Sequence, residues 1–356
     1  MRKLLLAGLA AGAIVAGADA AHAGDQLVIN HNADQFASLP DGVRYPEGIA
    51  ANPATGDIYV GTFDFGPNAN KLMRFAKNGH LSAVKDFGGA PLLGLEFDAA
   101  HGTLYILNFG ASKVQRIAAN FDASTPVEDV ATFPHIGAPG PRITGNPDTS
   151  NDTITFGSTG MPAPNAMTID RSGNAYVSDS FQGAIFRIDS IATCAKPCAV
   201  TVVKQDPLLA TAGFPPFGAN GVALDAAQTS LFIANTGDNR VLRMDLATKA
   251  ISVFAESVHG ADGVVLDDDG RLWVAANQAD QIVALNESGR VVARLGEFQG
   301  IRKDGTPDGL LFPASPVIVG GWMYVTNLAL PLTGNAAEWE ADVKRWTIAR
   351  IKLPKR

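Results

Sequence analysis

Short apolar runs alternate with turn residues along most of the chain, and the alternation repeats. Each unit begins with one residue that precedes Gly or Ala, followed by three mostly apolar residues and then Asp or Asn. A turn and a second apolar strand complete the unit. A strand, a turn rich in Asp, Asn and Gly, and another strand indicate a β-hairpin. The opening positions of the six copies, the last aligned approximately, are Glu47, Leu93, Asn165, Asn220, Asp262 and Ala314.

Further strands follow these hairpins at regular intervals. Third strands are expected at residues 71–75, 113–117, 184–188, 240–244 and 281–285, and outer strands at residues such as 127–132, 251–254 and 291–294. Units of three or four short strands that recur in this way predict blades packed around a channel. The fold class is therefore all-β, a six-bladed β-propeller. We expect residues 26–29 and 347–351 to pair within the last blade and close the ring.

The amino terminus has the features of a secretory signal peptide. Arg2 and Lys3 precede an apolar run of residues 4–17, and a small-x-small site ends at Ala23. The run is short for a membrane span, and an uncleaved anchor is the alternative interpretation. We therefore expect cleavage of residues 1–23 and a mature, periplasmic or secreted protein of residues 24–356, with no membrane attachment. No linker divides the mature chain, which indicates a single domain.

One region interrupts the repeat. Residues 137–164, rich in Gly, Pro, Asn, Asp and Thr, form a long insertion between the second and third copies. Long loops in compact domains are usually either functional lids or disordered segments. The interpretation favoured here is a lid over one mouth of the channel.

Net charge limits the classes of binding partner, and the cysteine content indicates a disulfide. The chain carries a net charge of −7, which becomes −8 when Arg2, Lys3 and Asp19 leave with the leader. Nucleic-acid binding requires clustered basic residues, so this acidity argues against it, and against anionic membrane surfaces. Cys194 and Cys198 are the only cysteines. In an oxidising compartment their spacing favours a local disulfide over a redox-active pair.

The opening position of each repeat is where chemistry is expected. In a propeller the innermost strands line the axis, so these six side chains should encircle one mouth of the channel. Glu47, Asn165, Asn220 and Asp262 bear oxygen atoms, and two carboxylates with two amide carbonyls suit Ca²⁺ or another divalent cation. The absence of His and Cys from the set argues against zinc or copper. The alternative is that Asn and Asp only initiate turns here, but a purely structural role would favour one residue type throughout.

The motifs around three of these positions resemble those of a known family. Residues 45–48, 219–222 and 261–267 are similar to the blade-entry motifs of the SMP-30/gluconolactonase/LRE-like family, whose plan paraoxonase-type lactonases share. The resemblance implies a six-bladed, calcium-dependent propeller whose catalytic metal is held by Glu47, Asn165, Asn220 and Asp262. Residues 220–225 and 234–240 are equally typical of NHL-type repeats, many of which bind partners without catalysis. Asn165 departs from the family pattern, because Ala166 follows it where Gly is usual.

The leading hypothesis is a calcium-dependent hydrolase of lactones or related esters. The cation would polarise the carbonyl of a small-molecule substrate. Asp262 would orient or deprotonate the attacking water, and His259 is a candidate proton shuttle, although a solvated loop histidine is the plainer interpretation. The alternative is a non-catalytic NHL-like propeller that binds a protein, peptide or sugar. A different propeller enzyme, such as a lyase or a strictosidine-synthase-like protein, is the third hypothesis. The chain has no serine-hydrolase elbow and no phosphate-binding loop.

Overall fold

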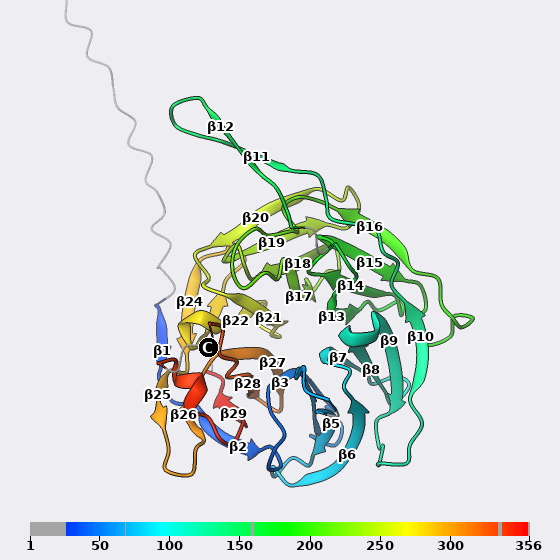
Figure 1. Ribbon diagram of the computed structural model, residues 1–356, viewed down its shortest axis with the longest axis vertical. Helices are drawn as coiled ribbons and strands as arrows, with labels where there is room; N and C mark the ends of the chain where they lie inside the picture. The colour runs from blue at the N-terminus through cyan, green and yellow to red at the C-terminus, as the bar shows by residue number, and fades with distance from the viewer. Residues whose placement is uncertain (1–25, 68, 158–159, 334–336, 355–356) are drawn as a thin grey trace, which may run out of the picture.

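The computed structural model describes residues 26–67, 69–157, 160–333 and 337–354. The predicted signal peptide lies outside these residues. Within them, six sheets, each built on four antiparallel strands, stand around a central axis (Figure 1). The prediction of a six-bladed, all-β propeller is confirmed. The only helices in the described residues are three short 3₁₀ turns, namely η1 (Phe109–Ala111), η2 (Asn277–Ala279) and η3 (Trp339–Asp342).

The first three blades follow the repeat in chain order. Blade 1 contains β3 (Pro46–Ala51), β4 (Ile58–Thr62), β5 (Asn70–Phe75) and β6 (Leu81–Gly88). Blade 2 contains β7 (Leu92–Asp98), β8 (Thr103–Asn108), β9 (Lys113–Ala118) and β10 (Glu128–Thr132). Blade 3 contains β13 (Pro164–Ile169), β14 (Ala175–Asp179), β15 (Ala184–Ile188) and β16 (Thr201–Gln205).

The remaining blades complete the ring. Blade 4 contains β17 (Ala219–Leu224), β18 (Ser230–Asn235), β19 (Arg240–Asp245) and β20 (Ile251–Glu256). Blade 5 contains β21 (Ala261–Leu266), β22 (Leu272–Ala276), β23 (Gln281–Leu285) and β24 (Val291–Leu295). A hairpin of β25 (Phe298–Ile301) and β26 (Pro307–Gly309) leads to blade 6, which contains β27 (Pro313–Val319), β28 (Trp322–Asn327), β29 (Thr347–Lys352) and β2 (Asp34–Ser38).

The ring closes differently from the sequence prediction. The strand that completes blade 6 is β2, antiparallel to β29, whereas β1 (Val28–Asn30) joins β24 of blade 5 in parallel. The prediction for residues 26–29 was therefore wrong, and that for residues 347–351 was right. Burial gives the reason. Phe36 and Ala37 of β2 enter the core between blades 6 and 1, while Val28 and Ile29 remain 37% and 54% exposed.

Apolar clusters between neighbouring blades hold the propeller together. The second strand of every blade is almost wholly buried and supplies large side chains such as Tyr59, Tyr105 and Trp273. Tyr59 packs on Phe121 of the next blade, and Trp273 shares a cluster with Met323. Each blade buries both of its faces against neighbouring blades, so the inner strands that line the channel are held in fixed positions.

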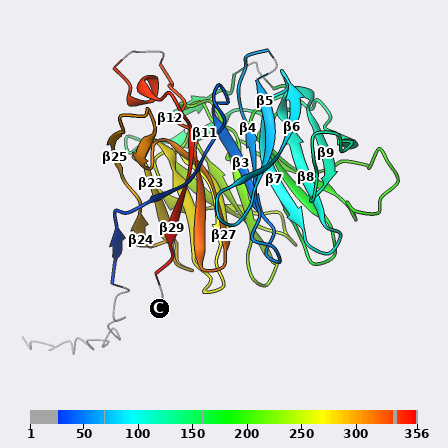
Figure 2. The same ribbon diagram turned by 90° about the horizontal axis from the view of Figure 1, so that it is seen from below.

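The two ends of the channel are distinguished by strand direction. In Figure 2, β29 runs to the carboxyl terminus at the lower face, and β27 runs in the same direction because β28 is antiparallel to both. Inner strands therefore begin at the upper face, called here the entry face, and end at the opposite, exit face.

The insertion at residues 137–164 contains a hairpin that the sequence analysis did not predict. It is formed by β11 (Arg142–Gly145) and β12 (Asn151–Ile154) and extends outward from the ring (Figure 1). An ion pair between an Arg142 guanidinium nitrogen and an Asp238 carboxylate oxygen, 2.6 Å apart, anchors the base of this hairpin to blade 4. The hairpin itself points away from the axis, so it does not cover a channel mouth.

The predicted disulfide is present. Cys194 and Cys198 are bonded within the loop between β15 and β16, with 5.5 Å between their Cα atoms. In the described part of the chain, no helix combines the length and the apolar character that crossing a bilayer demands.

Candidate metal centre

The six opening positions of the repeat occupy one equivalent place in the structure. Each is the second residue of an inner strand, where the pairing register with the next strand shifts, as between Pro46 and Ile49 or between Ala261 and Val264. A β-bulge re-aims the side chains it carries. The same bulge in all six blades therefore directs this position toward the entry face of the channel.

The glycine that follows most of these positions allows the inner strands to approach one another. A Cβ atom on Gly48 would lie 2.1 Å from the carbonyl oxygen of Leu93, and one on Gly221 would lie 2.3 Å from that of Asp262. Each glycine thus packs on the backbone of the next blade's opening residue. Any side chain there would push neighbouring blades apart.

Ala166 replaces this glycine in blade 3, and a hydroxyl group compensates. Ser178 accepts a hydrogen bond from the Ala166 N–H at 3.0 Å and donates to the carbonyl oxygen of Asn220 at 2.5 Å. In blade 6, Thr326 does the same between Ser315 and the carbonyl of Glu47. The departure at Ala166 therefore leaves the position of Asn165 intact.

The structure brings the four predicted ligands together. Glu47, Asn165, Asn220 and Asp262 line one cavity of about 120 Å³ at the entry face, together with Leu93. Ala314, the sixth position, is absent from its lining. Thr236 and Asn277, which sequence reasoning missed, also reach it.

The hydrogen-bond network fixes which end of each asparagine is available. The Ser180 hydroxyl donates to the carbonyl of Ala219, and the Thr236 hydroxyl to that of Ala261, both at 2.7 Å. Having used their protons, these hydroxyls accept from Asn165 Nδ2 and Asn220 Nδ2, each at 2.9 Å. A hydroxyl that donates elsewhere can only accept here, so both amides present their oxygens to the cavity.

The two carboxyl groups are buried without compensation. Glu47 and Asp262 are each 4% exposed. Among the described residues, Glu47 Oε2, Asp262 Oδ1 and Asn277 Oδ1 have no hydrogen-bond partner. The residues that line this cavity in the described chain include no Lys, Arg or His. Unpartnered buried acceptors are costly, and a hydrogen-bond donor or a cation would offset that cost.

Burial dominates the electrostatics of this pair. It raises the pKa of Glu47 well above its usual value, and the nearby charge of Asp262 adds to the rise. Burial also raises the pKa of Asp262 to about 7, although hydrogen bonds from Asn277 and Asn220 oppose the shift. Carboxylates crowded in this way are stabilised by a shared cation.

The donor set fits a hard divalent cation. Two carboxylates and two amide oxygens match the oxygen ligands of Ca²⁺. No cluster of three or more His, Cys, Asp or Glu side chains with metal-site geometry occurs in the described residues. The candidate site therefore depends on the asparagine oxygens as much as on the acids.

His259 lies apart from this cavity. It is exposed in the turn before β21 and is not among the lining residues. The missed residues follow a recognisable rule: Ser180, Thr236 and Asn277 each stand 15 or 16 positions after an opening residue and hydrogen-bond to it. That spacing was the available signal.

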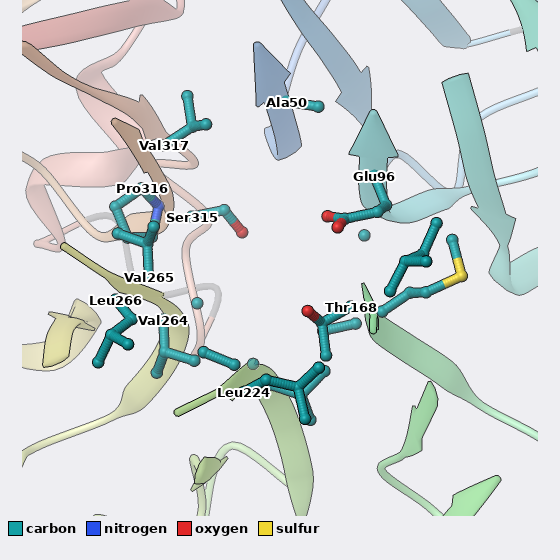
Figure 3. Close-up of a pocket in the computed structure, with 18 of the residues that line it drawn as sticks. Ala50, Glu96, Thr168, Leu224, Val264, Val265, Leu266, Ser315, Pro316 and Val317 are labelled. Carbon is teal, nitrogen blue, oxygen red and sulfur yellow. The ribbon is translucent and has the colours of Figure 1, made fainter. Parts of the chain in front are cut away.

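A second cavity of about 580 Å³ opens at the exit face of the same channel. Its walls combine apolar side chains with polar groups, among which are Glu96, Thr168 and Ser315 (Figure 3). Burial raises the pKa of Glu96 to about 8. Sequence reasoning did not single out this glutamate.

Comparison with known proteins supports the expected resemblance. Residues 164–296 match the SMP-30/Gluconolactonase/LRE-like region. This segment holds three of the four predicted ligands, and the family resemblance is thereby confirmed. No curated protein matches the chain.

Several solved structures share the propeller. Regucalcin, a calcium-binding protein from Agrobacterium tumefaciens strain C58, superposes with a TM-score of 0.61 at 14% identity over 92% of this chain and 97% of its own. A putative gluconolactonase gives 0.58 at 16% identity over 92% and 94%. Virginiamycin B lyase from Staphylococcus aureus gives 0.52 at 14% identity over 89% and 98%. At these identities the likeness shows the fold alone.

Proposed function

We propose that this protein is a calcium-dependent hydrolase of lactones or related esters. The observation that carries the proposal is the buried pair Glu47 and Asp262, whose unpartnered oxygens share a cavity with the oriented amides of Asn165 and Asn220. The family match over residues 164–296 and the similarity to gluconolactonase-type propellers support it.

Each residue has a defined part in the proposal. Glu47, Asn165, Asn220 and Asp262 would hold the cation, which when bound would polarise a substrate carbonyl. Asp262 Oδ2 accepts from Asn277 Nδ2 at 3.0 Å, which fixes the carboxyl plane and leaves Oδ1 toward the cavity. That oxygen is suited to orient a water molecule for attack. Ser180 and Thr236 are positioning residues, because they act through the asparagines.

For His259 the proposed role is that of a proton shuttle outside the cavity. Its exposure outside the cavity suits proton exchange with solvent rather than contact with substrate. As a proton shuttle His259 would contribute to turnover and not to binding, so His259→Gln should lower kcat with KM unchanged. An unchanged kcat would assign all proton transfer to the cavity residues.

The test is hydrolysis of a panel of lactones and aryl esters by the purified protein. Turnover should require Ca²⁺, disappear on chelation, and fall by at least about 10²-fold in Asp262→Asn. The control is Asp189→Asn, which alters an exposed aspartate. Absence of turnover, together with absence of a calcium-dependent rise in melting temperature, would contradict the proposal and favour the non-catalytic binding propeller.

We also propose that the protein works in the periplasm or outside the cell. The Cys194–Cys198 disulfide supports this location, because such bonds persist in oxidising compartments. Fractionation of the native host, followed by immunodetection, tests it. Recovery of the protein in the cytosolic fraction alone would contradict it.

A further inference from the structure

The cavity that holds the candidate ligands is polar only at its floor. The groups around its opening are apolar. They are Phe63, Phe214, Pro215, Pro216, Phe217, Phe312, Leu328, Leu330 and Leu332. A molecule that reaches the floor must therefore pass along hydrocarbon surface.

Two phenylalanines of the lining, Phe63 and Phe217, belong to a cluster of four packed rings. Phe63, Phe109, Phe181 and Phe217 contact one another in a closed circuit, and we call them the phenylalanine wall. Ring centroids are 5.5 Å apart for Phe63–Phe109, 5.9 Å for Phe109–Phe181, 5.3 Å for Phe181–Phe217 and 6.2 Å for Phe217–Phe63. Three of these contacts are edge to face and Phe181–Phe217 is tilted, and rings packed in this way make a stiff surface whose shape is set before a ligand binds.

Part of this apolar surface faces solvent. Phe214, which lines the cavity, is 56% exposed, and Phe65, which packs on Phe63, is 70% exposed. A contiguous exposed apolar patch at the mouth of a cavity is typical of a ligand-binding surface. The patch adjoins the polar floor, so one molecule can contact both.

The free oxygen atoms at the floor, on Glu47, Asp262 and the two asparagines, are those assigned to the cation and the attacking water. Asn165 and Asn220 use their amide nitrogens on Ser180 and Thr236, and those hydroxyls donate to backbone carbonyls. The lining residues around the opening carry no polar side chain, so the hydroxyl groups of a sugar lactone would lie against phenylalanine and leucine without partners. An unsatisfied buried hydroxyl weakens binding by roughly 5- to 150-fold, the equivalent of about 1–3 kcal/mol.

We propose that the substrate is a lactone or ester that carries an apolar alkyl or aryl group, and not a polyhydroxylated sugar lactone. The carbonyl end lies at the floor beside Glu47 and Asp262, and the apolar group lies on the phenylalanine wall and Phe214. This inference rests on the proposed hydrolase function, whose site it shares.

The experiment compares lactones of one ring size that differ in the length of a saturated alkyl side chain, with glucono-δ-lactone as the polar member, all in the presence of Ca²⁺. The value of kcat/KM should rise about three- to fourfold for each added methylene until the wall is covered. It should be at least about 100-fold lower for gluconolactone than for the best alkyl lactone. A flat series, or a preference for gluconolactone, would overturn the inference while leaving the hydrolase proposal standing.

A binding measurement separates the two proposals. The corresponding alkyl lactams resist hydrolysis, and calorimetric titration with Ca²⁺ present reports their affinity directly. If no lactone is hydrolysed but lactam affinity increases with chain length, the hydrolase proposal fails and the apolar preference stands. If affinity is independent of chain length, the apolar preference fails whatever the turnover.

Variants test whether the assigned surface is responsible. Phe214→Ser removes an exposed ring and should reduce the gain per methylene to less than twofold. The control is Val253→Ser, which removes a 41% exposed apolar side chain from the outer strand β20 and should leave the series unchanged. Phe217→Leu keeps an apolar side chain in the wall and should retain most of the gain. Equal gains in wild type and Phe214→Ser would overturn the assignment of this surface.

Discussion

Asn277 donates from Nδ2 to Oδ2 of Asp262 over 3.0 Å, while its own Oδ1 is buried without a partner among the described residues. Asn277 begins the 3₁₀ turn η2, directly after the second strand of blade 5, and Asp262 is the second residue of the first strand of that blade. One side chain thus sets the orientation of the carboxyl group and adds an oxygen to the same buried site. This bond explains why a polar residue is needed at this strand end.

Gly260 makes room for this asparagine, and an alanine there should destabilise the protein. A Cβ atom at position 260 would lie 1.8 Å from Asn277 Oδ1, on a backbone with φ of +63°. The left-handed conformation alone costs an alanine about 1–2 kcal/mol. Gly270→Ala is the matched control, since φ is +79° there and nothing lies within 4 Å. In urea unfolding, Gly260→Ala should lose at least about 1 kcal/mol more than Gly270→Ala. Equal losses would mean that Asn277 relaxes without strain.

Replacement of Asp262 by asparagine should affect stability in opposite directions with and without calcium. Without the ion, the variant should be at least as stable as wild type, because it removes an ionisable group buried beside Glu47. With Ca²⁺ at about 100 times its Kd, wild type should gain about 2.7 kcal/mol and the variant should not.

Differential scanning fluorimetry with and without Ca²⁺ checks this prediction. Asp189→Asn, at an exposed aspartate, should keep the wild-type calcium response. A calcium response retained in full by Asp262→Asn would remove Asp262 from the set of ligands.

The ring of opening residues could be predicted because the repeat gives each one an equivalent place. Six inner strands around one axis must bring Glu47, Asn165, Asn220 and Asp262 to the same mouth, whatever the loops do. The sequence did not indicate that the asparagines would turn their oxygens inward. That depends on Ser180 and Thr236 donating to the next blade, a contact between strands that local patterns do not encode.

The errors at the ends of the ring have a related cause. Residues 26–29 and 34–38 are both short segments with strand-forming residues, and only packing decides between them. Phe36 packs against Tyr324, with 4.7 Å between the ring centroids, and β2 therefore forms the edge strand of blade 6. Glu96 was missed because a glutamate in an alternating strand is expected to lie on the outer surface, whereas this one faces the channel.

Loss of the Ser178 hydroxyl should loosen the junction between blades 3 and 4. This hydroxyl accepts from the part-buried Ala166 N–H and donates to the buried Asn220 carbonyl, so Ser178→Ala removes the partner of both backbone groups. The expected loss is about 1–3 kcal/mol in the free energy of unfolding. Ser172→Ala, at an exposed turn of the same blade, should change it by less than about 0.5 kcal/mol. A similar effect of the two changes in denaturant titrations would show that water replaces the Ser178 hydroxyl.

Glu96 should make the protein less stable as the pH rises. Its pKa is raised by burial from 4.5 to about 8, so between these values the folded chain retains a proton that the unfolded chain has released. Stability falls with pH wherever the folded state binds more protons, and this contribution is lost progressively from about pH 4.5 to pH 8. Glu96→Gln removes the titration. The variant should match wild type near pH 4.5 and exceed it at pH 8 by on the order of 2 kcal/mol, since water in the channel relieves part of the linkage energy.

Urea unfolding at a series of pH values measures the difference between the two proteins. Glu256→Gln, which changes an exposed glutamate on β20, is the control and should parallel wild type throughout. Other buried acids, such as Glu47 and Asp262, titrate in both proteins and cancel in the comparison. A constant difference between Glu96→Gln and wild type across this range would mean that Glu96 ionises freely in the channel, with water or a bound cation replacing the lost hydration.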